Sequence, residues 1–359
     1  MTKTGGAFAC LQVSSRRLRV VAATGAGVHV VAEVPRALPS DSSRFATRLT
    51  WSGSRFFVCG PDKVPPLVWD GATWEEIDGP SFEAGVDQTW RVHGDGSVTV
   101  VAEEGHGLRS FARSIAYRAP RDATWQSVAL PPGLVVSDVL VRPEGILSIS
   151  GGIVDEGAAA STASCPFLGE VRDGRLEATP PALSKRDWRR LTDAGVETFG
   201  RIDVTTRGTV VAAPTVAFFD VPRDFLVLDG KHCRVKRLPG FLRTWLDLPD
   251  GLVALTTDGG GRRTNDFGHT WQSFRLGGRL ARETGGRGNL SLTGAAYSRG
   301  TVAISFSFHD SRKEPSELLL SGLALTEPDF QRFELVDVAE SGGREMLAVT
   351  TDVERDQRA

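Results

Sequence analysis

The sequence predicts an all-β protein in which one four-stranded unit repeats around a closed ring. Two signals carry this prediction, and they alternate along the 359 residues. The first is a corner in which an Asp-Gly turn precedes a β-forming segment. The second is a glycine that opens a run of β-branched residues. Asp accepts backbone N–H bonds inside tight turns and glycine takes positive φ angles without steric cost, so each signal marks a place where one strand turns into the next.

The clearest corner lies at residues 264–274, where a turn rich in Asp and Gly is followed by Thr270 and Trp271. Thr and Trp favour a pleated, half-buried surface, so a strand is expected directly after the turn. Four further segments keep part of the pattern, at residues 70–77, 121–128, 173–179 and 229–235. The first two of them retain Thr-Trp, and the last two retain only Asp-Gly. These corners are expected to join the third strand of a unit to its fourth.

The second signal occurs six times in step with the first. The turn glycines that precede β-rich runs are Gly53, Gly96, Gly145, Gly208, Gly251 and Gly300, at spacings of 43, 49, 63, 43 and 49 residues. A period of roughly 40–50 residues is typical of propeller blades, each of which is a four-stranded sheet. We therefore predict a single-domain β-propeller over residues 1–353, with seven four-stranded blades. Six or eight blades are also compatible with the spacing, because one interval is long.

The ends of the chain are expected to close the ring together. Residues 7–34 hold strand-like runs for only an incomplete blade, and residues 345–351 supply one spare strand that completes it. The six fuller blades are predicted at residues 45–80, 86–133, 135–183, 198–240, 241–278 and 290–337. Residues 354–359 are polar and are predicted to fray, as chain termini commonly do.

The composition is that of an ordinary globular protein, with 24% charged and 40% hydrophobic residues. A formal net charge of −2 gives no indication of nucleic-acid or membrane binding. No apolar run resembles a signal peptide or a membrane span, so a cytoplasmic protein is expected. The fold is expected to be monomeric, with the oligomeric state left open. The four cysteines form no Cys-x-x-Cys pair and are expected to be buried hydrophobes, which predicts no metal and no cofactor: Cys10, Cys59, Cys165 and Cys233.

One stretch in the long interval predicts a short helix rather than a strand. Ser184 is suited to cap its N-terminus, with Trp188 and Leu191 on the inward face. Four basic residues lie between positions 185 and 190. They are interpreted either as a solvated surface segment or as a local anion-binding patch.

The pattern Thr264-x-Asp266-x-Gly268-x-Thr270-Trp271 resembles the Asp-box, or BNR, repeat of sialidase-like and YVTN-type β-propellers. In proteins with this repeat the box lies at an outer corner, away from the central channel. The resemblance therefore implies a structural role for these residues. It also implies that the tryptophans of the three corners pack between neighbouring sheets: Trp74, Trp125 and Trp271.

Ligands of propellers usually sit at the central channel, on the inner strands and the loops entering them. The inner strands are predicted at residues 45–51, 86–92, 135–141, 199–205, 241–248 and 290–297. Their polar and charged side chains form the predicted binding set, namely Arg48, Arg91, Asp138, Arg201, Asp203, Arg243, Asp247 and Tyr297. Charges of both signs favour an anionic or polar ligand. A water-filled channel with mutually compensating charges is the alternative.

The resemblance also raises a catalytic alternative. Sialidases use an arginine triad, a Tyr nucleophile paired with Glu, and an Asp acid, and they carry a Phe/Tyr-Arg-Ile-Pro signature. That signature is absent here, and Arg201-Ile202-Asp203 is the nearest fragment. Tyr297 lies on a predicted inner strand, but no Glu partner can be assigned. We therefore predict no catalytic residues and a binding or scaffold protein for a protein partner or a small polar ligand, with a divergent sialidase-like glycoside hydrolase as the alternative.

Overall fold

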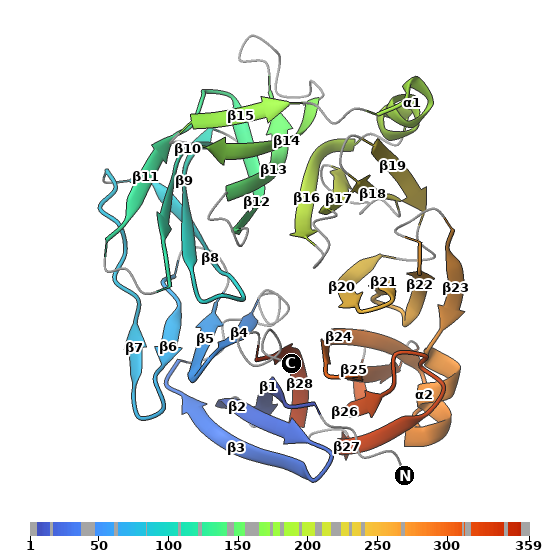
Figure 1. Cartoon of the computed structure of the whole chain (residues 1–359). Helices are drawn as coiled ribbons and strands as arrows, with labels where there is room; N and C mark the ends of the chain where they lie inside the picture. The colour runs from blue at the N-terminus through green and yellow to red at the C-terminus, as the bar shows by residue number, and fades with distance from the viewer. Residues whose placement is uncertain are drawn as a thin grey trace.

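The chain forms an all-β, single-domain propeller, shown as a computed structural model in Figure 1. The structure describes residues 6–14, 17–36, 47–60, 64–83, 85–106, 109–120, 124–141, 147–154, 165–172, 175–179, 183–193, 196–204, 210–216, 224–229, 232–237, 241–266, 270–310, 312, 317–340 and 344–352. The predicted tail at 354–359 lies outside these residues. Among them, no helix is long and apolar enough to cross a membrane.

Within the described residues, six sheets are blades built from four consecutive antiparallel strands, ordered from the channel outward. The first two are β4 Arg48–Ser52, β5 Arg55–Cys59, β6 Leu67–Trp69 and β7 Trp74–Glu76, then β8 Asp87–Val92, β9 Val98–His106, β10 Arg109–Arg118 and β11 Gln126–Ala129. The next two are β12 Leu134–Val141, β13 Leu147–Ile153, β14 Cys165–Arg172 and β15 Arg175–Thr179, then β16 Val196–Val204, β17 Val210–Val216, β18 Asp224–Asp229 and β19 His232–Arg237. The last two are β20 Leu242–Leu248, β21 Gly251–Thr256, β22 Gly260–Thr264 and β23 Gln272–Arg275, then β24 Asn289–Ser298, β25 Thr301–Asp310, β26 Glu317–Thr326 and β27 Phe333–Glu340.

A further four-stranded sheet closes the ring from both ends of the chain. It pairs β28 Arg344–Thr351 with β1 Phe8–Ser14, followed by β2 Arg17–Thr24 and β3 Gly27–Val34. The blade count of seven must therefore be corrected to six blades of consecutive strands plus this composite sheet. The reason is physical: the first segment supplies only three strands, and its inner edge is satisfied by antiparallel pairing of β1 with β28, in a register that places Leu11 opposite Ala348.

The turn glycines behave as expected wherever they are described. Gly53, Gly96 and Gly300 take positive φ angles of 58°, 84° and 80° in the turns between the first and second strands of their blades. Gly251 has a φ of 154°, and a Cβ atom there would lie 1.9 Å from the carbonyl oxygen of Thr264. A larger residue at position 251 would therefore separate β21 from β22. Gly145 and Gly208 lie outside the described residues.

The hydrophobic core lies between neighbouring sheets rather than at the channel. One cluster joins the β20–β23 and β24–β27 blades through Val253, Leu255, Ile304 and Phe306, all with no exposed surface. A second cluster joins the composite sheet to the β4–β7 blade. Each blade buries its faces only against its neighbours, so the ring folds as one unit.

Two short helices lie on the outer side of the described ring, α1 Lys185–Asp193 and α2 Gly277–Thr284. Helix α1 confirms the prediction: the Ser184 hydroxyl oxygen accepts a bond from the Asp187 backbone N–H, and Leu191 is buried. Helix α2 was not predicted. It inserts Leu276 and Leu280, both fully buried, into the cluster that joins its two flanking blades.

The corner between β22 and β23 has the hydrogen bonds expected of an Asp-containing turn. Asp266 accepts bonds from the Thr264 hydroxyl at 2.8 Å, the Thr270 backbone N–H at 2.8 Å and the Thr270 hydroxyl at 2.6 Å. Gly268 lies outside the described residues. The side chain of Trp271 is partly buried, and among the described residues it packs on the cluster of Trp245, Leu252 and Ala254 in its own blade. Its assignment to the Asp-box repeat remains a resemblance.

The two other corner tryptophans differ from Trp271, although both are likewise only partly buried. Trp125 packs edge-on against Trp90 of its own blade at 6.0 Å, and it reaches the preceding blade through its indole N–H, which donates to the Asp78 carbonyl at 3.2 Å, and through the cluster that contains Phe57 and Ile77. Trp74 stacks at a tilt on Trp69 at 5.5 Å and joins the cluster shared with the composite sheet. These two rings therefore link neighbouring blades as expected.

Candidate functional site

The candidate site is an open cavity of about 650 Å³ at the centre of the ring. Every inner strand of the ring contributes to its wall: β4, β8, β12, β16, β20, β24 and β28. Successive side chains of an inner strand point to opposite faces of its blade, as Leu246 and Trp245 of β20 do, and the cavity runs along the inner edges of the sheets. The cavity therefore collects residues that are far apart in the sequence.

Six of the eight side chains predicted for the channel line this cavity: Arg48, Arg91, Asp138, Arg243, Asp247 and Tyr297. The structure thus brings together charges of both signs from four strands, with Tyr297 from a fifth. The side chains of Arg201 and Asp203 lie outside the described part of the chain. Between them, Ile202 is described, and it lines the same wall.

Asp138 connects three inner strands instead of facing a ligand. Its Oδ1 accepts the backbone N–H of Val139 at 3.1 Å and Nε of Arg91 at 3.4 Å. Its Oδ2 accepts the backbone N–H of Ile202 at 3.1 Å. The carboxylate is 9% exposed at the residue level, so these donors hold a charge with little access to water. Asp138 therefore ties β12 to β8 and β16.

Arg243 has a similar connecting role on the other side of the ring. Its Nε donates to the Thr293 carbonyl oxygen at 2.9 Å, and its Nη2 donates to the same oxygen. The Thr293 hydroxyl in turn donates to the Met346 carbonyl oxygen at 2.6 Å. This chain of bonds ties β20 to β24 and β24 to β28, so part of the positive charge of Arg243 is directed at a backbone carbonyl.

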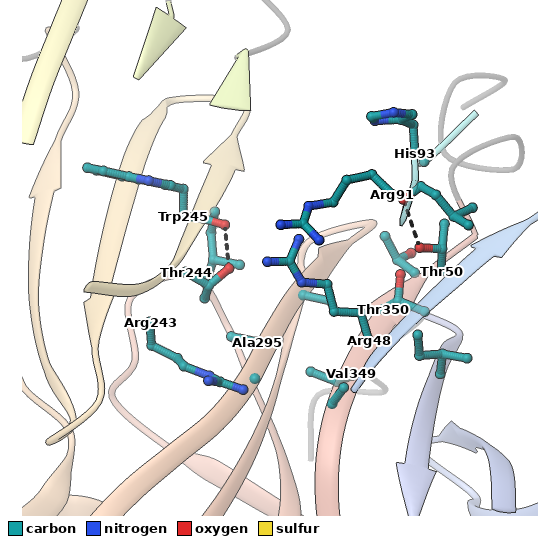
Figure 2. Close-up of a pocket in the computed structure, with 18 of the residues that line it drawn as sticks. Arg48, Thr50, Arg91, His93, Arg243, Thr244, Trp245, Ala295, Val349 and Thr350 are labelled. Atoms are coloured by element: carbon teal, nitrogen blue, oxygen red, sulfur yellow. Dashed lines mark hydrogen bonds between the residues drawn. The ribbon is translucent and has the colours of Figure 1, made fainter. Parts of the chain in front are cut away.

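Arg48 and Arg91 extend from β4 and β8 into the cavity, and Figure 2 shows their guanidinium groups turned toward one another. The two strands are joined nearby by a bond from the Thr50 hydroxyl to the Val92 carbonyl oxygen at 3.4 Å. The plane of the Arg91 group is fixed by its bonds to Asp138 and, through Nη1, to the Trp90 carbonyl oxygen at 3.1 Å. This wall of the cavity therefore carries two guanidinium groups beside the carboxylate of Asp138.

His93 lies beside these arginines without adding to their charge. The pKa of His93 is lowered from 6.5 to about 4, chiefly by burial; Asp95 and Asp138 oppose the change, and the positive charges of Arg91 and Arg48 support it. The ring nitrogen Nε2 lies 2.9 Å from the Thr99 hydroxyl. His93 is therefore neutral at pH 7, and sequence reasoning did not select it.

Sequence reasoning also missed the remaining wall. Strands β20, β24 and β28 add uncharged residues to the lining, namely Thr244, Ala295, Val349 and Thr350. The prediction selected charged residues and so passed over threonines. Their positions on inner strands were the available signal.

Tyr297 lines the cavity, but its hydroxyl oxygen accepts the Gly300 backbone N–H at 3.2 Å, in the turn between β24 and β25. Among the described residues, no carboxylate is hydrogen-bonded to this hydroxyl. The same part of the chain contains no group of three His, Cys, Asp or Glu side chains placed to hold a metal ion.

No protein-family model matches the chain, and no curated protein matches it in sequence. Its structure is similar to that of Sqt1 from Saccharomyces cerevisiae, with a TM-score of 0.50 and 9% identity over 96% of this chain and 93% of that one. YCF48 from Cyanidioschyzon merolae gives 0.49 and 11% identity over 88% and 98% of the two chains. YCF48 bound to D1 peptide gives 0.48 and 14% identity over 82% and 90%. The likeness to Sqt1 supports the propeller fold alone.

Proposed function

We propose that this chain is a non-catalytic binding protein that engages a protein partner or a small polar ligand at the central channel. The observation that carries this proposal is the cavity of about 650 Å³, lined from every inner strand by charged, hydroxyl and apolar groups. Ligand sites are typically concave, with a few polar groups placed among apolar ones, and such sites commonly span 300–1,000 Å³. A ring held by cross-strand bonds offers that surface with little rearrangement.

The proposal is tested by filling the cavity. Ala295 lies on its wall, so Ala295→Trp places an indole in the space a ligand would occupy. The matched control is Ala72→Trp at an exposed corner between β6 and β7. Immobilised wild-type, control and filled proteins are incubated with lysate of the source organism, and bound proteins are quantified. A panel of polar metabolites is measured in parallel by thermal shift.

We expect some proteins or metabolites to bind the wild type and Ala72→Trp but not Ala295→Trp. Melting curves establish that the filled variant is folded. If Ala295→Trp retains the complete set of ligands, binding does not use the channel and the proposal is wrong.

One observation favours a second candidate, a divergent sialidase-like hydrolase: three arginines and Tyr297 line one cavity. The hydroxyl of Tyr297 faces a turn N–H, and Asp138 is engaged by three donors, so neither has the contacts of a nucleophile or a proton donor. A fluorogenic sialoside separates the two candidates. Turnover that disappears in Tyr297→Phe would establish the hydrolase and refute the binding proposal.

A further inference from the structure

We propose that Arg48 and Arg91 form a clamp for an oxyanion, a carboxylate or phosphate group carried by the ligand of the channel. This inference rests on the proposed binding function and names the chemistry that the channel recognises. The group belongs either to a free small molecule or to an acidic side chain of a protein partner, and the two sources share the same chemistry at the clamp.

The placement of the two arginines is the first step. They come from neighbouring blades, and both guanidinium groups enter the same cavity from the β4 and β8 wall, turned toward one another (Figure 2). A guanidinium presents a rigid fork of N–H donors that matches the oxygens of a carboxylate or phosphate. An oxyanion between the two groups is attracted by both charges and accepts bonds from both forks.

The second step is that Arg91 is held in advance. Its Nη1 donates to the Trp90 carbonyl oxygen at 3.1 Å and its Nε lies 3.4 Å from Oδ1 of Asp138, and together these contacts favour one orientation of the fork before a ligand arrives. Asp138 has its own oxygens engaged by two backbone N–H groups as well, so it is a positioning residue rather than a ligand contact. A group held in advance loses less conformational entropy on binding.

The third step concerns the rest of the ligand. Thr244 and Ala295 lie across the cavity from the clamp, and Val349 and Thr350 lie beside Arg48. These uncharged groups are available to the remainder of the ligand. Arg243, the third arginine, bonds twice to the Thr293 carbonyl oxygen and so belongs to the strand connections. The inferred ligand is therefore acidic at one end and apolar or hydroxylated at the other.

Isothermal titration of the full chain at low and at physiological salt tests the clamp with defined probes. Citrate and inorganic pyrophosphate represent free oxyanions, an end-capped hexaglutamate peptide represents an acidic protein segment, and end-capped hexaglutamine is the neutral control. Binding of at least one acidic probe is expected, and hexaglutamine is expected not to bind. Citrate or pyrophosphate binding alone identifies a free small molecule, whereas hexaglutamate binding alone identifies a protein partner.

Arg48→Gln and Arg91→Gln should each weaken that binding about tenfold or more, because each removes a charge-assisted donor pair. Arg48→Lys, which keeps the charge and loses the fork, should give an intermediate loss. The matched control is Arg17→Gln, since the Arg17 side chain is 69% exposed on the outer part of the composite sheet. It should leave binding within about twofold of wild type.

The clamp is wrong if no acidic probe binds the wild-type chain, or if both glutamine variants bind as the wild type does. An equal loss in Arg17→Gln would also overturn it, since attraction by net charge would then explain the binding. Thermal melts of each variant separate lost binding from lost folding. If ligands depend on Ala295 but not on Arg48 or Arg91, the channel function stands and only the oxyanion clamp fails.

Discussion

Replacing Asp138 by Ala should destabilise the whole ring, although the residue lies at the cavity. Its carboxylate joins β12 to β8 and β16 through bonds with Val139, Ile202 and Arg91. The change removes the acceptor for two buried backbone N–H groups. An unpaired buried donor costs about 1–3 kcal/mol, so the expected loss in the free energy of unfolding is about 2–6 kcal/mol. The bond to Arg91, at 3.4 Å, is long and adds little.

Equilibrium unfolding in urea, followed by tryptophan fluorescence, measures this loss. Asp138→Asn keeps one acceptor oxygen and should lose less than Asp138→Ala. The control is Asp193→Ala at the exposed C-terminal end of α1, which should stay within about 0.5 kcal/mol of wild type. If Asp138→Ala unfolds at the urea concentration of the wild type, the carboxylate does not hold the inner strands together. Its role would then have to be reassigned to the ligand.

Two other perturbations test different parts of the structure. Asp266→Ala should lower the free energy of unfolding in urea by about 1 kcal/mol, because the corner is partly solvated and water replaces some of the lost bonds to Thr264 and Thr270. Unchanged stability would show that the corner forms without its carboxylate. Burial holds the pKa of His93 at about 4, below its ordinary 6.5, so the unfolded chain binds the extra proton first as the pH falls. Stability should therefore decrease as the pH is lowered from 6.5 toward 4, and His93→Gln should flatten that part of the curve; equal slopes for the two proteins would refute the assignment.

The strand pattern of this chain was open to prediction because turns leave strong local signals. Gly53, Gly96 and Gly300 must take positive φ angles, and the predicted inner strands follow from the runs between such turns. Selecting charged residues and one tyrosine on those runs found six side chains that share a cavity. The turn residues and the residue types on each run were sufficient to select these side chains.

What escaped prediction depends on contacts between distant segments. Helix α2 begins with Gly277 and Gly278, which are poor helix formers, and it is stabilised by the burial of Leu276 and Leu280 between two blades. The partial burial of Trp271 likewise depends on the segments packed around it, which the corner pattern does not specify. Whether an arginine such as Arg243 faces a ligand or a carbonyl is decided by a neighbouring strand, which the sequence of β20 does not specify.

The composite sheet also determines how long β1 must wait for its partner during synthesis of the chain. Strand β1 emerges from the ribosome before β28, which follows it by more than 300 residues. At a synthesis rate of about 5–20 residues per second, β1 waits on the order of tens of seconds for β28. Throughout that time Ala9 and Leu11, fully buried in the finished ring, belong to a strand with an open backbone edge. The nascent chain is therefore open to wrong pairing at β1 until β28 has been made and pairs with it.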